Sequence, residues 1–355
     1  MRNIFGGAES LNANAAFGTR TRSAYSLAFD TPILSNPDFR FELEALQSAT
    51  NKAWASHEER LRGGTTRLKY LTPGGHRHEF SYTGMWRQNS GLAEKASPTV
   101  RADAGDSFKS SLSHTWVHDV RDYALLPTRG YYMKTVTELA GLGPLRGDVA
   151  FGKFEAEAQS SLPVPIPFLS TSQDTGISIT TSFRGGLLYP LTPASSGQPT
   201  QSRINDRFFL GGPSDVRGFR FAGLGPHDGA DAVGGDLYAA GGASILFPFP
   251  RVGKDKPLRF QAFINGGRLL ALTDVRSGDQ KGSGSGNLSG QDVARSVQST
   301  FAELVDGLPS MAAGVGVVYA LPVARFELNF SLPLVIRKGE EARKGISLGV
   351  GLSFL

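Results

Sequence analysis

The sequence predicts an all-β fold, an antiparallel β-sheet whose strands cross a membrane and form a barrel. Segments in which apolar and polar residues alternate recur along the 355 residues, and no helical period competes with them over a useful length. The face opposite the apolar one is often charged, which suits a wet lumen behind a lipid-facing wall but also a soluble sandwich. Glycine is frequent, with 44 residues in no fixed period, as expected where many short turns join closely packed strands.

The clearest strand is the last, from Gly345 to Leu355. Its side chains alternate between an apolar face and a face of glycine and serine, so the second face is expected to abut something close. About fourteen strands are predicted in all, at the spacing of an up-and-down array. The others are Leu11–Gly18, Arg22–Asp30, Phe39–Glu44, His57–Leu71, Glu79–Arg87, Asp106–Asp119, Gly130–Ala140, Asp148–Ser161, Ile177–Arg184, Gly234–Phe247, Leu258–Leu270, Met311–Tyr319 and Arg325–Phe330.

Connectors of unequal length favour the membrane barrel over the sandwich. Three of them are long, Asn89–Gly105, Tyr189–Pro226 and Thr273–Ser310, and they fall roughly at alternate turns. Long loops gathered on one rim are typical of barrels in membranes. The third contains a Gly/Ser-rich run, so residues 273–310 are predicted to form a flexible surface loop.

Aromatic residues near strand ends agree with the interfacial belts of a membrane barrel, although aromatic residues favour strands in any case. They are Trp54, Trp86, Trp116, Tyr70, Tyr131, Tyr132, Tyr238 and Tyr319.

Composition argues against several other classes of protein. The chain has no cysteine, which leaves neither disulfides nor thiolate metal sites, and no signal peptide or transmembrane helix is predicted. The formal charge of +5 comes from scattered rather than clustered residues, so no nucleic-acid partner is expected. His76 with His78 and His114 with His118 could each share a strand face, but no third ligand is evident. Neither a metal nor another cofactor is therefore predicted.

Enzymatic chemistry finds little support. Glu42 and Glu44 share a strand face with Arg40, which indicates a hydrated wall rather than a pair of carboxylates for acid–base catalysis. The sequence contains no phosphate loop, nucleophile elbow or dinucleotide fingerprint. The chain is not expected to be an enzyme.

One stretch, Phe208–Phe219, interrupts the strand pattern. Gly211, Gly212 and Pro213 break any ladder, and Val216-Arg217-Gly218-Phe219 presents a cation on a tight turn between apolar residues. Such a turn suits a loop tip that docks into a polar cavity, and it equally suits a surface turn whose arginine is solvated.

The same stretch carries a family resemblance. Its Phe-x-x-Gly-Gly-x-x-x-Val-Arg-Gly-Phe pattern resembles the signature of the outer-membrane barrel-assembly superfamily, whose members include bacterial BamA and the core barrel subunit of the mitochondrial sorting and assembly machinery (the SAM/TOB complex). The resemblance covers essentially the whole chain, and the mitochondrial, fungal-like branch fits better. The supporting segments are Arg2–Glu9, Ala96–Arg101, Ser107–Lys109, Pro127–Tyr131, Asp231–Asp236 and Phe263–Gly267.

The resemblance implies a single transmembrane barrel domain over residues 1–355, of a family type with sixteen strands, in the mitochondrial outer membrane. Residues 190–233 would fold into the lumen, with Gly211, Gly212, Val216, Arg217, Gly218 and Phe219 as the loop motif. The first and last strands would meet at a weak lateral seam, where precursor β-barrel proteins pair their C-terminal signal and are released into the bilayer. The pairing residues would be Ser347, Gly349, Val350, Gly351, Leu352 and Phe354. Accessory subunits of the complex would face the cytosol.

Two departures from the family pattern are evident. The family's N-terminal soluble domain and about its first strand and a half have no counterpart, so fourteen to fifteen strands are expected here. Bacterial relatives place acidic wall residues opposite the loop arginine, whereas the matching positions here are Leu246 and Asn265. Arg217 must therefore find another partner.

Two alternatives stay open at this point. The first is a protein-translocating pore of the same superfamily, which would pass its cargo through the barrel. The second is a soluble β-sandwich that acts as a binding module.

Overall fold

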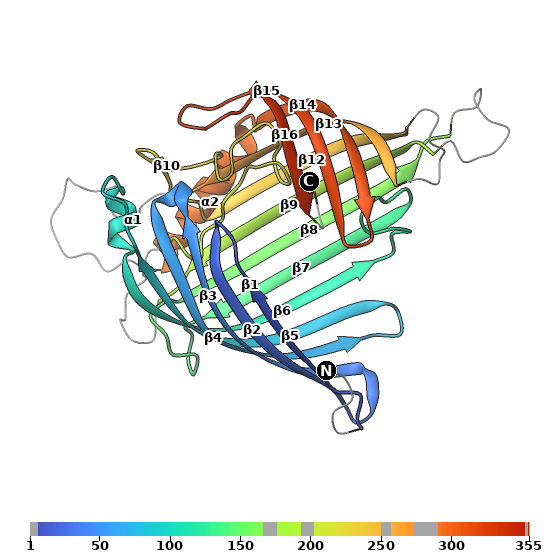
Figure 1. Ribbon diagram of the computed structural model, residues 1–355. Helices are drawn as coiled ribbons and strands as arrows, with labels where there is room; N and C mark the ends of the chain where they lie inside the picture. The colour runs from blue at the N-terminus through green and yellow to red at the C-terminus, as the bar shows by residue number, and fades with distance from the viewer. Residues whose placement is uncertain are drawn as a thin grey trace.

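A computed structural model describes residues 6–165, 176–192, 202–249, 257–272, 290–351 and 354. Within these ranges, fourteen strands form one antiparallel sheet in the order β1 to β9, then β12 to β16 (Figure 1). The first nine are Ser10–Ala16, Thr21–Ile33, Asn36–Lys52, His57–Leu71, His76–Ser90, Gly105–Asp119, Gly130–Ala140, Phe151–Pro163 and Ser178–Pro190. The last five, β12 to β16, are Leu237–Pro248, Leu258–Leu270, Ser310–Leu321, Ala324–Val335 and Gly345–Gly351. The predicted all-β meander of about fourteen strands is confirmed.

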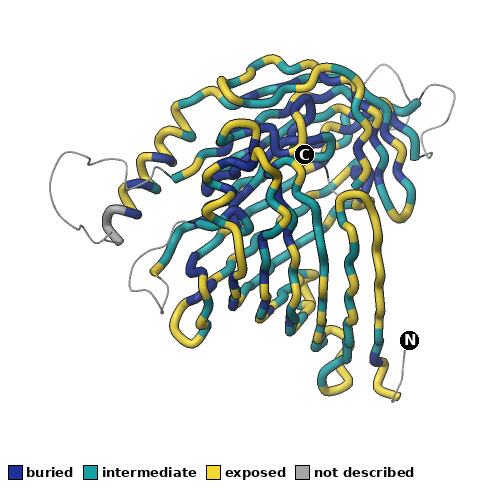
Figure 2. Tube along the Cα trace, turned by 60° about the vertical axis from the view of Figure 1, so that its left-hand side comes forward, coloured by how far each residue is buried: buried dark blue, intermediate teal, exposed yellow. Residues whose placement is uncertain are grey.

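The sheet curls strongly, and its outer, convex face is the apolar one. Along β15, Leu328 and Phe330 on the outer face are about half exposed, whereas Glu327 and Asn329 on the inner face are buried. Figure 2 shows this alternation of buried and exposed residues along the strands. A sandwich would pack one apolar face on another, but no second sheet covers this face in the described part of the chain. The soluble sandwich is therefore wrong.

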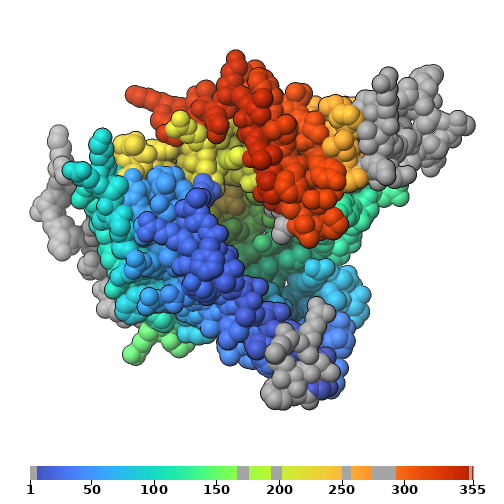
Figure 3. All heavy atoms as spheres, in the orientation of Figure 1, coloured from blue at the N-terminus to red at the C-terminus, as the bar shows by residue number. Residues whose placement is uncertain are grey.

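The two edges of the sheet are β1 and β16. Among the described residues no ladder joins them, and the sheet stays open between its first and last strands. Figure 3 shows a hollow between the N-terminal strands in blue and the C-terminal strands in red.

The three long connectors leave from the same end of the sheet, because they follow the fifth, ninth and eleventh strands of an antiparallel meander. This end is called the loop end below. The connector between β5 and β6 contains helix α1, Pro98–Ala102, and a short 3-10 helix, η1 (Ala53–Ala55), lies between β3 and β4. Strands β10 (His227–Asp228) and β11 (Asp231–Ala232) form a separate two-stranded ladder inside the connector between β9 and β12.

The prediction that no helix competes with the strands is wrong at residues 290–306. Helix α2, Gly290–Asp306, occupies much of the predicted loop 273–310, of which residues 273–289 lie outside the described ranges. Its buried stripe contains Val293, Ser296 and Thr300, at helical spacing. Two of these three residues are polar, so a search for apolar periodicity does not detect the helix.

Three of the predicted belt aromatics, Tyr238, Trp54 and Tyr132, lie on the inner side of the sheet instead, and the Tyr132 ring centroid is 4.4 Å from the guanidinium carbon of Arg121. Tyr238 packs on Phe208 with ring centroids 4.7 Å apart, and Trp54 packs on Phe221 at 4.5 Å. Both partners belong to the connector between β9 and β12. Others, such as Trp86 and Tyr319, are exposed on the outer face as predicted.

Candidate functional site

The connector between β9 and β12 forms a compact loop against the inner face of the sheet; its described residues, 202–236, are called the inner loop below. Leu210, Val216, Phe219 and Leu224 are buried and belong to one apolar cluster with wall residues that include Leu188 and Ala312. Burial of this cluster supplies the main driving force for docking the loop. The cluster holds the loop against β9, which precedes it in the sequence, and against β14, which follows it.

The turn at the loop tip is held by its own hydrogen bonds. Asp215 Oδ2 accepts from the backbone N of Gly211 at 2.8 Å, and the backbone N of Gly212 donates to the carbonyl of Val216 at 3.3 Å. Burial raises the pKa of Asp215, although the Gly211 hydrogen bond and Arg184 nearby act in the opposite direction. Gly218 has φ +86°, and a Cβ there would lie 2.7 Å from that of Ala312. Only glycine meets both demands without strain.

Arg217 projects from this turn into a buried polar cluster on the inner face of β13 and β15. Its Nε donates to Glu327 Oε2 at 3.0 Å, and its Nη2 lies 3.0 Å from the same oxygen. The exposed fractions of the two side chains are 2% and 0%. A two-donor contact of this kind is among the stronger interactions available to an arginine.

Glu327 is shared by further groups of the wall. Arg325 Nη2 lies 2.5 Å from Glu327 Oε1, and Asn329 Nδ2 and Gln261 Nε2 donate to Oε2 at 2.8 and 3.2 Å. The Arg217 guanidinium also stands over the ring of Phe263, 4.7 Å from its centroid. One buried carboxylate thus compensates two buried guanidinium groups, with neutral amides and an aromatic face completing the environment.

Glu327 is the partner that the sequence comparison with bacterial relatives did not identify. Asn265, one of the two positions considered, contributes differently: with its amide oxygen facing the loop, it accepts a hydrogen bond from the backbone N of Arg217 at 2.9 Å. Leu246, the other position, is buried in an apolar cluster with Leu125 and Val318. A signal for Glu327 was present, because it lies on the charged face of a strand whose other face is apolar.

The inner loop also contacts the N-terminal half of the sheet and its connectors. Asp206 Oδ1 lies 2.7 Å from Arg87 Nη1 of β5, with both side chains at most 5% exposed. Asp231 accepts from Ser56 Oγ at 2.5 Å and from the backbone N of Ser97, at the start of α1, at 2.8 Å. The loop therefore bridges the early and late strands.

A backbone pairing joins the loop tip to the connector that precedes β16. The N of Arg343 donates to the carbonyl of Gly218 at 2.8 Å, and the N of Arg220 donates to the carbonyl of Glu341 at 3.0 Å. Phe219 and Ala342 form an isolated antiparallel bridge. The loop tip is thus hydrogen-bonded to the segment that leads directly into the last strand.

The last strand, β16, is the C-terminal edge of the sheet and pairs on its other side with β15. Its outer face carries Ile346, Leu348 and Val350, all more than half exposed, and its inner face carries Ser347 and Gly349. A Cβ at Gly349 would lie 3.2 Å from the carbonyl oxygen of Pro213 in the inner loop, so the glycine face abuts a close neighbour, as predicted. Gly351 is the last residue of the strand, and Leu352 lies outside the described residues.

Phe354 departs from the predicted alternation. A regular strand would place it beside Leu348 on the outer face, but its side chain is buried, and its ring centroid lies 5.1 Å from the guanidinium carbon of Arg325 and 5.9 Å from that of Arg217. The strand ends at Gly351, and the aromatic ring covers the two buried cations.

An interior space of about 1000 Å³ lies between the two ends of the sheet. Arg20 and Trp54 line it from the N-terminal strands, and Ile346 and Ser347 line it from β16. Phe221 of the inner loop stands between them, with the Arg20 guanidinium 4.2 Å from its ring centroid. The unpaired edge of β16 therefore borders this interior space.

Metal ligands do not gather in the described part of the chain, where no group of three or more His, Asp or Glu side chains could hold an ion. His78 Nδ1 and His114 Nε2 are 3.2 Å apart, and the rings of His76 and His118 stack with centroids 4.1 Å apart. Within the same described ranges, no helix has the length and apolar character needed to cross a membrane.

Comparison with known proteins places these features in a family. Residues 3–354 match the model of the Omp85 superfamily domain. The chain is 38% identical over its whole length to a SAM50-like protein of Schizosaccharomyces pombe, covering 68% of that relative. It is also 31% identical to the human sorting and assembly machinery component 50 homolog, again over its whole length and 68% of the relative.

Solved structures agree on the fold. BamA from Haemophilus ducreyi lacking POTRA domains 1–3 superimposes with a TM-score of 0.73 at 13% identity, covering 99% of this chain and 65% of that one. At this identity the likeness concerns the fold alone.

Proposed function

The chain belongs to the Omp85 superfamily, in its sorting and assembly machinery branch, and we propose that it inserts and folds precursor β-barrel proteins in the mitochondrial outer membrane. It spans that membrane as a multi-pass β-barrel whose apolar outer face contacts lipid. The observation that carries the proposal is the unpaired edge of β16 beside an interior space, in a sheet with a bare apolar exterior.

Strand pairing at this edge is the proposed mechanism. The edge of β16 presents backbone N–H and C=O groups that can hydrogen-bond with an incoming strand, which supplies affinity and register without a catalytic side chain. Gly349 and Gly351 reduce side-chain packing on the inner face, so the pairing is weak enough to be exchanged. The C-terminal signal strand of a precursor binds first, and later strands follow it into the bilayer.

The inner loop couples the interior to this edge. Arg217 anchors the tip to Glu327, and the Gly218–Arg343 and Arg220–Glu341 hydrogen bonds extend the tip to the start of β16. A loop held in this way keeps the edge strand positioned while a precursor pairs with it, and its displacement accompanies release.

Accessory subunits bind at the cytosolic side, which we assign to the loop end. That end carries α1, α2 and the long connectors, which offer more distinctive surface than the hairpin turns opposite.

Disulfide crosslinking in outer membranes tests the proposal, because the chain contains no cysteine of its own. Single cysteines replace Ser347, Leu348 and Val350, and a precursor carries cysteines along its C-terminal signal strand. We expect crosslinks at paired positions only, shifting by one residue in one strand when the partner shifts by one in the other. Leu328→Cys is the matched control, since it lies on the outer face of β15, which is paired on both sides.

Crosslinks without register, or equal crosslinks at Leu328→Cys, would contradict strand pairing at β16. Recovery of the precursor beyond the membrane rather than in it would instead support the translocating pore.

A further inference from the structure

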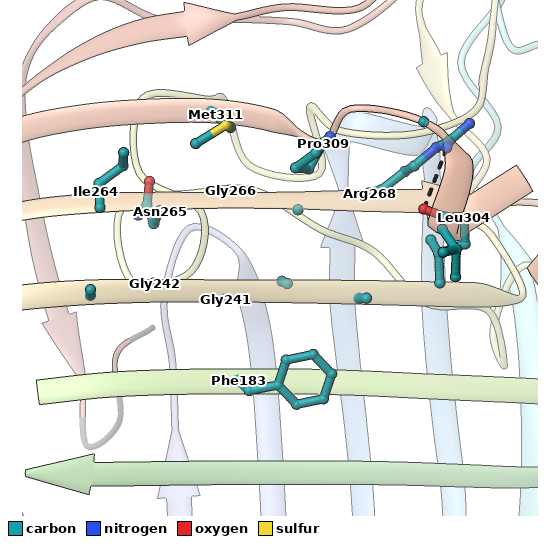
Figure 4. A pocket seen from close by; sticks show the side chains of 16 residues that line it. Phe183, Gly241, Gly242, Ile264, Asn265, Gly266, Arg268, Leu304, Pro309 and Met311 are labelled. Atoms are coloured by element: carbon teal, nitrogen blue, oxygen red, sulfur yellow. Dashed lines mark hydrogen bonds between the residues drawn. The ribbon is translucent and has the colours of Figure 1, made fainter.

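A shallow groove of about 460 Å³ lies on the outer face near the loop end, across β9, β12, β13 and β14 (Figure 4). Its floor lacks large side chains because Gly241 of β12 is directly opposite Gly266 of β13. Phe183 of β9 and Ile264 form parts of its sides, and Leu304, near the C-terminus of α2, lines the end beside Arg268. Its volume falls within the ~300–1,000 Å³ range of small-molecule sites, and most of its lining is apolar.

A cation stands at the α2 end of this groove. Arg268 is on the outer face of β13 and lines the groove, yet it is only 5% exposed. Its Nη2 lies 2.8 Å from Glu303 Oε1, and its Nη1 donates to the carbonyls of Glu303 and Leu304 near the C-terminus of α2. Figure 4 shows the side chain reaching from the strand to the helix.

The third donor of this guanidinium is unused. The Nε of Arg268 is buried and has no hydrogen-bond partner, which costs roughly 1–3 kcal/mol for a buried polar group. An outer-face arginine with an unsatisfied donor in an apolar groove points to an acceptor that is supplied from outside the chain.

A second guanidinium lies close to the first. A Cβ placed on Gly307 would be 1.9 Å from Arg268 Nη1 and 2.7 Å from Arg337 Nη2, so both groups converge on this glycine, which also lines the groove. Arg337 donates through Nε to the carbonyl of Leu308 at 3.1 Å. Glu303 and Glu340 are the acids nearby, with Glu340 accepting from Ser310 and from the backbone N of Arg337. The cluster has two cations and two carboxylates, and it offers hydrogen-bond donors rather than a net charge.

We propose that this groove is a binding site for one glycerophospholipid of the loop-end leaflet. An acyl chain lies along the Gly241–Gly266 floor, and a phosphodiester oxygen accepts the hydrogen bond from Arg268 Nε, with Arg337 beside it. The inference rests on the membrane location in the proposed function, since an apolar groove with guanidinium donors at one end matches a lipid only where lipid surrounds it. A phosphodiester is common to all such lipids, so the site selects a phospholipid over a neutral lipid rather than one headgroup over another.

The test uses the full chain in nanodiscs that contain a phosphatidylcholine with a photoactivatable diazirine in its acyl chain. Crosslinked peptides are identified by mass spectrometry, and phospholipid retained after detergent washing is measured by native mass spectrometry. We expect enriched adducts on peptides that contain Gly241–Ala243 and Met311, and one retained phospholipid per chain. Diacylglycerol with the same diazirine chain should give no enrichment there.

Three variants separate the parts of the site. Ala239→Leu combined with Ala243→Leu fills the groove from outward positions on β12 and should abolish the enrichment. Arg268→Met keeps the length of the side chain but removes the donors, and retention should fall at least about tenfold, as for loss of one charge-assisted hydrogen bond. Ala45→Leu is the matched control, because Ala45 is an exposed outward alanine on β3, far along the sheet from the groove.

Equal labelling of the groove in all four proteins would overturn the lipid site while leaving the proposed function intact. Absence of acyl-chain labelling anywhere on the outer face, including around Leu43 and Leu328, would overturn the membrane location instead. Loss of lipid retention on addition of a protein partner from the outer membrane, together with crosslinks to that partner at Met311, would assign the groove to protein and not to lipid.

Discussion

The inner face of the sheet differs sharply between its two halves, although the sequence patterns match. On β3, Arg40, Glu42 and Glu44 alternate with apolar residues, just as Arg325, Glu327 and Asn329 do on β15. The Glu42 side chain remains 13% exposed and its partner Lys69 38%, whereas Glu327 and Arg217 are 0% and 2% exposed. Equal alternation therefore leads to a hydrated wall in one half and a dry one in the other.

The difference comes from the inner loop and not from the strands. The loop tip covers the β13–β15 wall and supplies Arg217, while the β2–β4 wall balances its charges internally, for example between Arg67 and both Glu42 and Glu44. A charge removed from the hydrated wall can be compensated by water. On the dry wall no water can replace the hydrogen bonds that a removed charge had made to its buried partners, so the loss is far more costly.

The largest expected effect is at Arg217. Arg217→Ala leaves Glu327 fully buried with Arg325 as its remaining cation, and removal of one partner from such a pair costs about 3–5 kcal/mol. We expect a lower midpoint for urea unfolding in micelles, followed by the heat-dependent shift in gel mobility of folded barrels, and slower precursor release in membranes. The double variant Arg217→Met with Glu327→Gln should lose less stability than the sum of the two single variants, because both single variants lose the same Arg217–Glu327 contact. A double variant as unstable as the sum of both single variants would contradict a paired role for these groups.

Arg67→Ala is the matched change on the hydrated wall. Its guanidinium contacts three carboxylates, those of Glu42, Glu44 and Glu79, yet it is 24% exposed. Exposed pairs contribute at most about 1 kcal/mol, and Lys69 still pairs with Glu42. The same unfolding measurement should give a loss below that figure, and the loss should shrink further when salt is raised, unlike that at Arg217. A loss equal to that of Arg217→Ala would remove the distinction between the two walls.

The strands of both walls could be predicted from sequence, because period-two alternation depends only on neighbours along the chain. The segment that covers a wall could not be predicted from sequence, because Glu327 and its partner Arg217 are 110 positions apart. The alternation of Phe326, Glu327 and Leu328 does not reveal that the Glu327 carboxylate is buried. The turn of Phe354 under two cations was missed for the same reason. Helix α2 was missed because its buried stripe is partly Ser and Thr. The groove beside Arg268 was missed because its floor is formed by glycines of two strands, and their pairing is not visible in the sequence.

The smallest effect is expected at Asp122, a carboxylate that belongs to neither wall and lies in the connector between β6 and β7. It accepts hydrogen bonds from the backbone N of Thr128 and of Arg129, at 3.0 and 3.2 Å, and from Thr128 Oγ1. Partial burial opposes its ionisation, but these hydrogen bonds dominate and hold the pKa of Asp122 below its ordinary value. Because the folded pKa is the lower one, the stabilisation is complete above the unfolded value of about 4 and is lost as the pH falls through the folded value.

Neutral conditions should therefore leave the connector between β6 and β7 unchanged, and only stronger acid should loosen it. Hydrogen exchange at the amides of Thr128 and Arg129, relative to that of Val120, which donates to the Tyr131 carbonyl, measures this loosening. In Asp122→Asn the acid-dependent part should vanish, whereas the same acid-dependent rise in that variant would show that another group titrates.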